Sequence, residues 1–316
     1  LSMSKLYCLG ELLIDFQSVG TAPLKDTRQF VKNAGGAPAN VCVQAVKLGR
    51  QAAYLTQVGA DAFGDFLSET LKNEGVDISH VLRNGNYDTS LAFVSFLPGG
   101  ERQFSFYRRT AADLHFTAED FKDVSFERGD VFEFGSVALK TPESIEAHIS
   151  LIERAKAAGA AVCFDPNLRF NLWDDEDELR AVVNRFIPYA DIIKVGRDEL
   201  EFLSRGDAAQ AAESLFTGDV KIVLLTDSDK GAELLTKDGL RCSHGGFRVN
   251  TVDTTGAGDS FFGGFIAGFM DSGCDYENAD MQALLTFACK CGAFTTTRYG
   301  AIPAMGTKEE IDKAVK

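Results

Sequence analysis

The stretch DTTGAGDSFF, residues 253–262, joins a loop of small residues to an apolar helix. Gly256, Ala257 and Gly258 at the start of this helix leave room for a ligand to approach the backbone. The free N–H groups there, together with the helix dipole, form an anion site. The helix that follows is apolar around most of its circumference and is therefore predicted to be buried, through Phe261, Phe262, Phe265, Ile266 and Phe269.

Asp259 ends the loop with a carboxylate, which would repel a bound phosphate. The same carboxylate suits a base that accepts a hydroxyl proton while the neighbouring amides stabilise charge on a transferring phosphoryl group. As a bare G-x-G loop, Gly256 to Asp259 fits a turn and a helix N-cap equally well. Two other phosphate-binding loops are excluded, because the sequence has no G-x-x-x-x-G-K-[ST] and no G-x-G-x-x-G after its first apolar run.

Outside this stretch, short apolar runs alternate with helical stretches through most of the chain. This alternation predicts an α/β fold with a mostly parallel sheet covered on both faces, in which ligands collect beyond the carboxyl ends of the strands. The predicted strands lie within 5–11, 52–59, 130–135, 160–165, 191–196 and 221–227, and the predicted helices within 39–49, 144–159 and 174–187.

Two segments, 16–32 and 88–113, break this alternation. Residues 88–107 contain two β-rich runs joined by Pro98-Gly99-Gly100, with Phe104 and Phe106 alternating against polar neighbours. We expect a single domain over residues 1–316, in which both segments form an inserted β-sheet lid. Its apolar face would close a pocket, join a second subunit, or do both, and a homodimer through the lid is expected.

Composition limits the partners of the protein. The chain has 316 residues, 45% of them hydrophobic, and a formal net charge of −14, which disfavours nucleic acid and anionic lipid. The seven scattered cysteines, without a C-x-x-C, fit reduced thiols. There is no long apolar run and no signal-peptide pattern. We therefore expect a cytoplasmic protein without a nucleic-acid or membrane partner.

The sequence resembles the PfkB or ribokinase-like carbohydrate kinases, and the resemblance covers nearly the whole chain. It is carried by blocks in the family's order: GGAPANVCVQAVKLG (35–49), GADAFGDFL (59–67), FDPNLR (164–169), DTTGAGDSFFGGF (253–265) and TTTRYGAIPA (295–304). The resemblance implies a ribokinase-like three-layer fold with a small lid and ATP-dependent transfer to a primary sugar hydroxyl. Asp259 would be the catalytic base, and the amides of Gly256, Ala257 and Gly258 the anion hole.

For the sugar, the resemblance implies hydrogen bonds from Asp15, Gly35, Gly36 and Asn40. A carboxylate and an amide can each pair with adjacent hydroxyls. Considered alone, Asp15 fits a solvated strand end and Asn40 a helix start.

FSFYRRTAAD and DPNLR resemble the fructokinase branch and its relatives, the 2-keto-3-deoxygluconate kinases, in which arginines at the positions of Arg108 and Arg169 face the pocket. An exposed lid charge for Arg108, and an ion pair with Asp165 for Arg169, are the structural alternatives. Fructose is the first choice of substrate; a keto-acid sugar and a catalytically inactive sugar-binding relative stay open.

For ATP, the resemblance implies a family N-x-x-E element, which here retains Glu199 but has Gly196 in place of asparagine. It also implies a T-x-G-x-x-G strand end, here Thr226 to Gly231 with Ser228 for the first glycine. Glu199 would organise hydrated Mg²⁺. Cys289 would pack on the adenine or be a plain core cysteine. A monovalent cation, K⁺, is also implied, with Asp253 and main-chain carbonyls as its ligands, at Thr255, Thr295, Arg298 and Gly300.

Overall fold

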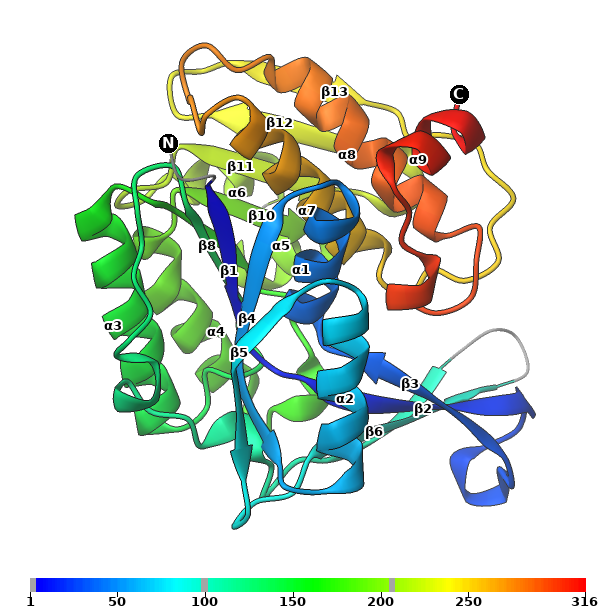
Figure 1. Ribbon diagram of the computed structural model, residues 1–316. Helices are drawn as coiled ribbons and strands as arrows, with labels where there is room; N and C mark the ends of the chain where they lie inside the picture. The colour runs from blue at the N-terminus through cyan, green and yellow to red at the C-terminus, as the bar shows by residue number, and fades with distance from the viewer. Residues whose placement is uncertain (1–3, 98–101, 205–207) are drawn as a thin grey trace.

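A large sheet forms the centre of the molecule in the computed structural model, which describes residues 4–97, 102–204 and 208–316 (Figure 1). All of its strand pairs are parallel except β11–β12 and β12–β13 at one edge. The predicted mostly parallel sheet is therefore confirmed. Its nine strands run in the order β13 (Arg241–His244), β12 (Ala232–Thr236), β11 (Ile222–Thr226), β10 (Ile192–Gly196), β9 (Ala161–Asp165), β8 (Val131–Gly135), β1 (Lys5–Leu9), β4 (Gln51–Gly59) and β5 (Asp77–Asn84).

Helices cover both faces of this sheet, as the continuous apolar runs of its strands require. Successive residues of β1 show the division, since Leu6 and Cys8 belong to one hydrophobic core while Tyr7 and Leu9 belong to the other. The first core is covered by α1 (Ala37–Lys47), α2 (Ala62–Asn73), α7 (Ala257–Asp271) and α8 (Met281–Thr295), with α9 (Lys308–Ala314) against α8. The second is covered by α3 (Pro142–Ala158), α4 (Glu176–Phe186), α5 (Arg197–Ser204) and α6 (Ala208–Ser214).

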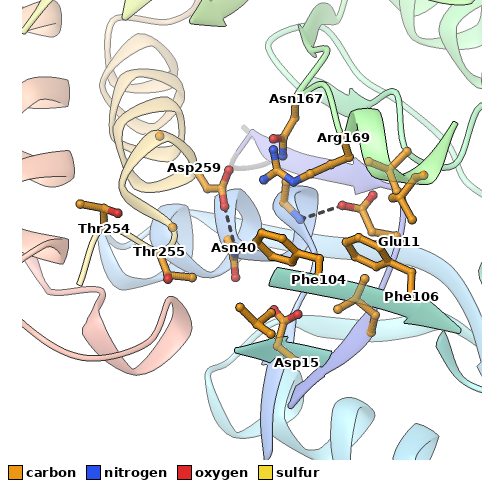
Figure 2. Close-up of a pocket in the computed structure, with 18 of the residues that line it drawn as sticks. Glu11, Asp15, Asn40, Phe104, Phe106, Asn167, Arg169, Thr254, Thr255 and Asp259 are labelled. Carbon is orange, nitrogen blue, oxygen red and sulfur yellow. Dashed lines mark hydrogen bonds between the residues drawn. The ribbon is translucent and has the colours of Figure 1, made fainter. Parts of the chain in front are cut away.

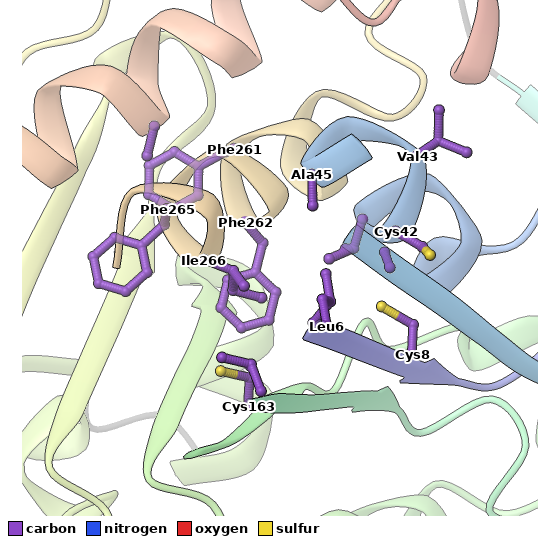
Figure 3. Packing of buried hydrophobic residues seen from close by; sticks show 14 of the residues in the cluster. Leu6, Cys8, Cys42, Val43, Ala45, Cys163, Phe261, Phe262, Phe265 and Ile266 are labelled. Carbon is purple, nitrogen blue, oxygen red and sulfur yellow. The ribbon is translucent and has the colours of Figure 1, made fainter. Parts of the chain in front are cut away.

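Helix α7 is the buried helix that the sequence predicts. It packs against both α1 and α8, and its aromatic side chains reach down to residues of the central sheet (Figure 3). Phe262 and Phe265 are fully buried. This packing fixes the N-terminus of α7 at the carboxyl edge of the sheet, so the position of the glycine loop is set by the core.

A second sheet stands off the main one, at the lower right of Figure 1. Its central pair, β2 and β6, is parallel, and its outer pairs are antiparallel. The predicted small sheet is therefore present, although the Pro98-Gly99-Gly100 turn lies outside the described residues. The four strands run in the order β3 (Phe30–Gly35), β2 (Leu13–Thr21), β6 (Ser90–Phe96) and β7 (Arg102–Tyr107).

The two faces of the small sheet differ. One face lines the polar cavity described below and carries Asp15, Phe104 and Phe106. The opposite face carries Phe16 and Phe93, whose rings stack with centroids 4.8 Å apart. None of the helices in the described parts of the chain combines the length and apolar composition needed to cross a bilayer.

Candidate active site

A cavity of about 510 Å³ lies between the carboxyl edge of the main sheet and the small sheet (Figure 2). Segments that are distant in the sequence meet in it: the strand β2, the start of α1, the loop after β9, the end of β10 and the start of α7. Its polar side chains include Asp15, Asn40, Asn167, Arg169, Lys194 and Asp259. This is the edge at which the α/β pattern predicts a ligand.

Asp259 lies in the first turn of α7 and lines the cavity, although only 8% of its surface is exposed. Asn40 Nδ2 donates a 2.8 Å hydrogen bond to Asp259 Oδ2. Burial raises the pKa of Asp259, and Lys194, Asn40 and Arg169 oppose that rise. A carboxylate that faces a cavity, is held by an amide and has a raised pKa has the properties of a general base.

The glycine loop lies beside Asp259 at the cavity. Gly256 is the N-cap of α7 with φ of 76°, a conformation that suits glycine, and both Gly256 and Gly258 line the cavity. A Cβ added at Gly258 would lie 3.2 Å from Lys194 Nζ. Ala257 does not line the cavity, and its N–H donates to Thr254 O at 3.3 Å. The anion hole implied for all three residues remains a prediction, and Gly258 has the most direct access to the cavity.

Asp15, Gly36 and Asn40 all line the cavity. Gly35 is placed beneath Asp15, because a Cβ at Gly35 would lie 2.2 Å from Asp15 Oδ2. Burial raises the pKa of Asp15 to about 6, with Arg169 lowering it and Asp259 raising it further. Two carboxylates and an amide thus face a space suited to a ligand with several hydroxyl groups.

The two predicted arginines are in different environments. Arg169 is exposed and lines the cavity, and its alternative partner Asp165 is bonded to Lys194 instead, at 2.9 Å. Arg108 is not among the described residues that line this cavity and lines a neighbouring one, so the expectation that it faces the sugar remains a prediction. Arg108 is 6% exposed, donates to Ser90 Oγ and the Val137 carbonyl, and forms a 2.9 Å ion pair with Asp113. A buried guanidinium needs such partners.

The sequence predictions missed several polar cavity residues, among them Glu11, Asn167 and Lys194. Glu11 Oε1 accepts a hydrogen bond from the Ala37 N–H, whereas Glu11 Oε2 and Asn167 Nδ2 are buried without a partner in the described structure. Asn40 Oδ1 is in the same state. Buried polar atoms without partners are uncommon, and three around one cavity indicate that a polar ligand completes them.

Some signal for these residues existed in the sequence. Asn167 lies within the block FDPNLR, and its φ of 44° is a conformation that asparagine tolerates. Glu11 lies at the end of the predicted strand 5–11, where parallel sheets place ligand contacts, and Lys194 is a charged residue within the mostly apolar predicted strand 191–196. Burial raises the pKa of Glu11 to about 7, against the opposing charge of Arg108.

Of the residues predicted to contact the nucleotide, Gly258 lines the cavity, whereas most of the others lie at and after the end of β11 or in α8. Thr226, Ser228, Gly231 and Cys289 are not among the described residues that line the cavity. Cys289 is 7% exposed within the core, and burial raises its pKa to about 12. Glu199 accepts hydrogen bonds from two backbone N–H groups, from Leu168 at 2.6 Å and Gly196 at 2.7 Å.

The turn between β11 and β12 contains two residues with positive φ. Ser228 has φ of 50° and Gly231 has φ of 95°, so both occupy conformations favoured by glycine. Next to this turn, Arg197 pairs with Asp227 at 3.0 Å and with Glu233 at 2.9 Å.

Several residues predicted to bind a monovalent cation contact one another, and the cation site itself remains a prediction. Asp253 Oδ1 accepts hydrogen bonds from Thr255, and Asp253 Oδ2 accepts one of 3.0 Å from the Gly300 N–H. Thr295 is buried close by, and its hydroxyl donates to Ser260 Oγ. Arg298 is exposed, with its side chain directed to Glu310. In the described part of the chain, no three His, Cys, Asp or Glu side chains gather as metal ligands.

Comparisons with known proteins agree with this geometry. Residues 3–308 match the model of the pfkB family carbohydrate kinases. Fructokinase-2 of Oryza sativa subsp. japonica is 40% identical over 313 residues, which cover 96% of this chain and 93% of that protein.

Solved structures are similar over the whole chain as well. The fructokinase from Xylella fastidiosa with bound ATP is 33% identical with a TM-score of 0.87, covering 99% of this chain and 98% of that one. A double mutant of the Vibrio cholerae O395 fructokinase, in fructose-, ADP- and potassium-bound form, is 31% identical with a TM-score of 0.89, covering 100% and 99%. The expected ribokinase-like fold is confirmed.

Proposed function

The chain belongs to the pfkB family of carbohydrate kinases, and we propose that it transfers the γ-phosphoryl group of ATP to a primary hydroxyl of fructose, giving fructose 6-phosphate. Its similarity to fructokinases from a plant and from bacteria supports fructose as the acceptor. The observation that carries the proposal is Asp259, whose carboxylate lines the cavity beside the glycine loop while Asn40 holds it.

Each part of the cavity has a role in this reaction. Asp259 accepts the proton of the attacking hydroxyl, and the amides at the start of α7 stabilise charge on the transferring group. Asp15 and Asn40 bind sugar hydroxyls, as does Arg169, and the backbone at Gly36 completes this wall. The aromatic face of the small sheet, with Phe104 and Phe106, excludes water that would otherwise hydrolyse ATP.

Two ions are part of the proposal. Glu199 is held by backbone amides, and the described residues contain no cluster of three His, Cys, Asp or Glu side chains, which would suit a hydrated Mg²⁺ that keeps several waters. K⁺ would be held by the Asp253 carboxylate and main-chain carbonyls of Thr255, Thr295, Arg298 and Gly300, an oxygen-only set suited to a hard cation. These ions supply charge compensation for the phosphates when bound.

We also propose a homodimer through the outer face of the small sheet. Phe93 contacts Phe16, Phe30 and Tyr107 on this face with ring centroids 4.8 to 5.6 Å apart, and Tyr107 is 64% exposed. An aromatic cluster of this kind is typical of a protein interface. A cytoplasmic location is proposed as well, since all seven cysteines are free thiols.

A panel of sugars in a coupled ADP-release assay tests the function. Fructose is expected to give the highest kcat/KM. A higher value for 2-keto-3-deoxygluconate would reassign the substrate, because the guanidinium of Arg169 also suits a carboxylate. No ADP release with any sugar would favour an inactive sugar-binding relative. The Asp259→Asn variant in the same assay controls for contaminating kinases.

A further inference from the structure

Lys194 places a buried ammonium group at the centre of the site. It lies in β10, is 7% exposed and lines the cavity. Its Nζ donates a 2.9 Å hydrogen bond to Asp165 Oδ2. The 3.2 Å separation between Nζ and a Cβ added at Gly258 places the ammonium directly against the first turn of α7.

Lysine is seldom buried without a strong reason. Burial by itself would lower the pKa of Lys194, but the carboxylates of Asp165, Glu199 and Asp259 raise it well above its usual value. The group is therefore a permanent cation at neutral pH. Of the two arginines expected here, Arg108 lies outside the cavity in its own ion pair and Arg169 is exposed, so Lys194 is the buried cation at the start of α7.

The strand geometry directs this cation to the phosphoryl position. Residues 194 and 196 point to the same face of β10 because strand side chains alternate, and Gly196 offers no side chain there. Lys194 is thus the side chain with which this strand end meets the glycine loop. Lys194, the glycines at the start of α7 and Asp259 therefore line the same cavity.

We propose that Lys194 is a catalytic residue whose ammonium binds the transferring phosphoryl group and stabilises the charge on its oxygens, and that Asp165 is a positioning residue that holds this ammonium. In the step, the sugar oxygen forms a bond to the γ-phosphorus, and its proton passes to Asp259. The bond from the γ-phosphorus to the bridging oxygen breaks, and ADP leaves with the electron pair. Lys194 keeps its proton throughout. This inference rests on phosphoryl transfer at this site and not on the identity of the sugar.

The test compares Lys194→Met with the parent enzyme, using the sugar that the parent phosphorylates fastest. We expect kcat to fall roughly 100- to 1,000-fold, as for loss of one charge-stabilising donor, while sugar affinity stays within about threefold. Inhibition by ADP with aluminium fluoride, a planar mimic of the transferring group, should be lost. Lys122→Met removes a lysine that is 60% exposed and also ion-paired, and serves as the matched control.

Asp165→Asn tests the positioning role through the pH profile. Without that carboxylate the ammonium loses its proton more readily, so the alkaline limb of kcat should move to lower pH. If Lys194→Met does not fold, Lys194→Arg and Lys194→Gln give the same comparison, and the charged variant should retain at least about tenfold more kcat.

Three results would overturn the proposal. One is a kcat for Lys194→Met within about threefold of the parent. Another is a raised KM for the sugar with unchanged kcat, which would place the ammonium on the sugar. The third is equal kcat for the arginine and glutamine variants. If the parent turns over another sugar better than fructose, the proposed substrate fails, and the Lys194 comparison proceeds with that sugar.

Discussion

The two halves of the candidate site are built in different ways. On the proposed sugar side, Asp15, Asn40 and Asp259 present side chains to one cavity. Buried polar atoms of Glu11, Asn40 and Asn167 have no hydrogen-bond partner in the described structure. On the nucleotide side, the predicted residues lie in turns defined by backbone conformation, with Ser228 at φ 50° and Gly231 at φ 95°.

This difference explains where the sequence departs from its family's pattern. A side chain that accepts a proton or binds a hydroxyl group cannot be replaced without loss of that chemistry. A turn that presents backbone groups needs only its dihedral angles, so serine can occupy a position favoured by glycine at a moderate free-energy cost. The change at Ser228 is therefore compatible with retained ATP binding, whereas the change at Gly196 removes the asparagine side chain of the family pattern.

The largest expected effect is on the sugar side of the site, at Asp259. Asp259→Asn should lower kcat by roughly 10²- to 10⁴-fold, because it removes the general base. Fructose affinity, measured by calorimetry, should remain near that of the parent. The Asp123→Asn variant, at an exposed position, serves as the control. Turnover of Asp259→Asn near the parent rate would show that Asp259 is not the general base. The contrast between a sugar side that depends on side chains and a nucleotide side that depends on the backbone would then fail.

The two arginines provide a matched pair within the sugar half. Arg108→Met leaves the buried Asp113 carboxylate without its ion-pair partner and should lower the free energy of unfolding by about 3–5 kcal/mol. Arg169→Met should leave thermal stability nearly unchanged and raise KM for fructose. Denaturation curves and steady-state kinetics of both variants separate these roles. The reverse assignment, with Arg108→Met stable but weak in sugar binding, would support the original prediction for Arg108.

The pKa of Asp15, raised to about 6 by burial, predicts a pH effect on sugar binding. As pH falls through about 6, Asp15 takes up a proton and loses its role as a charged acceptor, so KM for fructose should rise. Asp15→Asn should have a higher KM that is flat over this range. A parallel pH dependence in this variant would assign the effect to another group.

Linkage gives the opposite sign for folding. The folded protein binds the Asp15 proton more tightly than the unfolded chain does, because burial raises the pKa above its ordinary value. The free enzyme should therefore gain stability as pH falls from about 6 toward 4. Urea denaturation of the parent and of Asp15→Asn at several pH values measures this contribution by difference.

The smallest expected effects concern the nucleotide side, where backbone conformation defines the turns. Ser228→Gly relieves a left-handed serine and should raise the free energy of unfolding by about 0.5 kcal/mol, with KM for ATP unchanged. Gly231→Ala should destabilise by more, roughly 1–3 kcal/mol, because its Cβ would meet the His244 carbonyl oxygen at 1.9 Å. A large rise in KM for ATP in Ser228→Gly would show that the serine side chain itself contributes to binding.

Much of the fold was predictable from local pattern. Predicted strands such as 160–165 and 191–196 agree with β9 and β10 to within a residue, because buried parallel strands read as continuous apolar runs. The buried helix α7 and the cavity position of Asp259 followed from the stretch 253–262 in the same way. The helix α2 was missed, since its amphipathic pattern lies within a block considered only for its resemblance.

Side-chain partners depend on long-range packing, and there the sequence alone was insufficient. The sequence alone gives no reason to distinguish the environments of Arg108 and Arg169. In the structure Arg108 forms an ion pair with Asp113, whereas Arg169 lines the cavity. The pairing of Lys194 with Asp165 instead of Arg169 with Asp165 also appeared only in the structure.

Local sequence determined the strands, the buried helix and the position of the proposed base, since hydrophobic periodicity and a helix start act over a few residues. The tertiary structure decided which charged side chains form ion pairs. The free energy of a buried ion depends on all of the protein groups that take the place of its hydration shell.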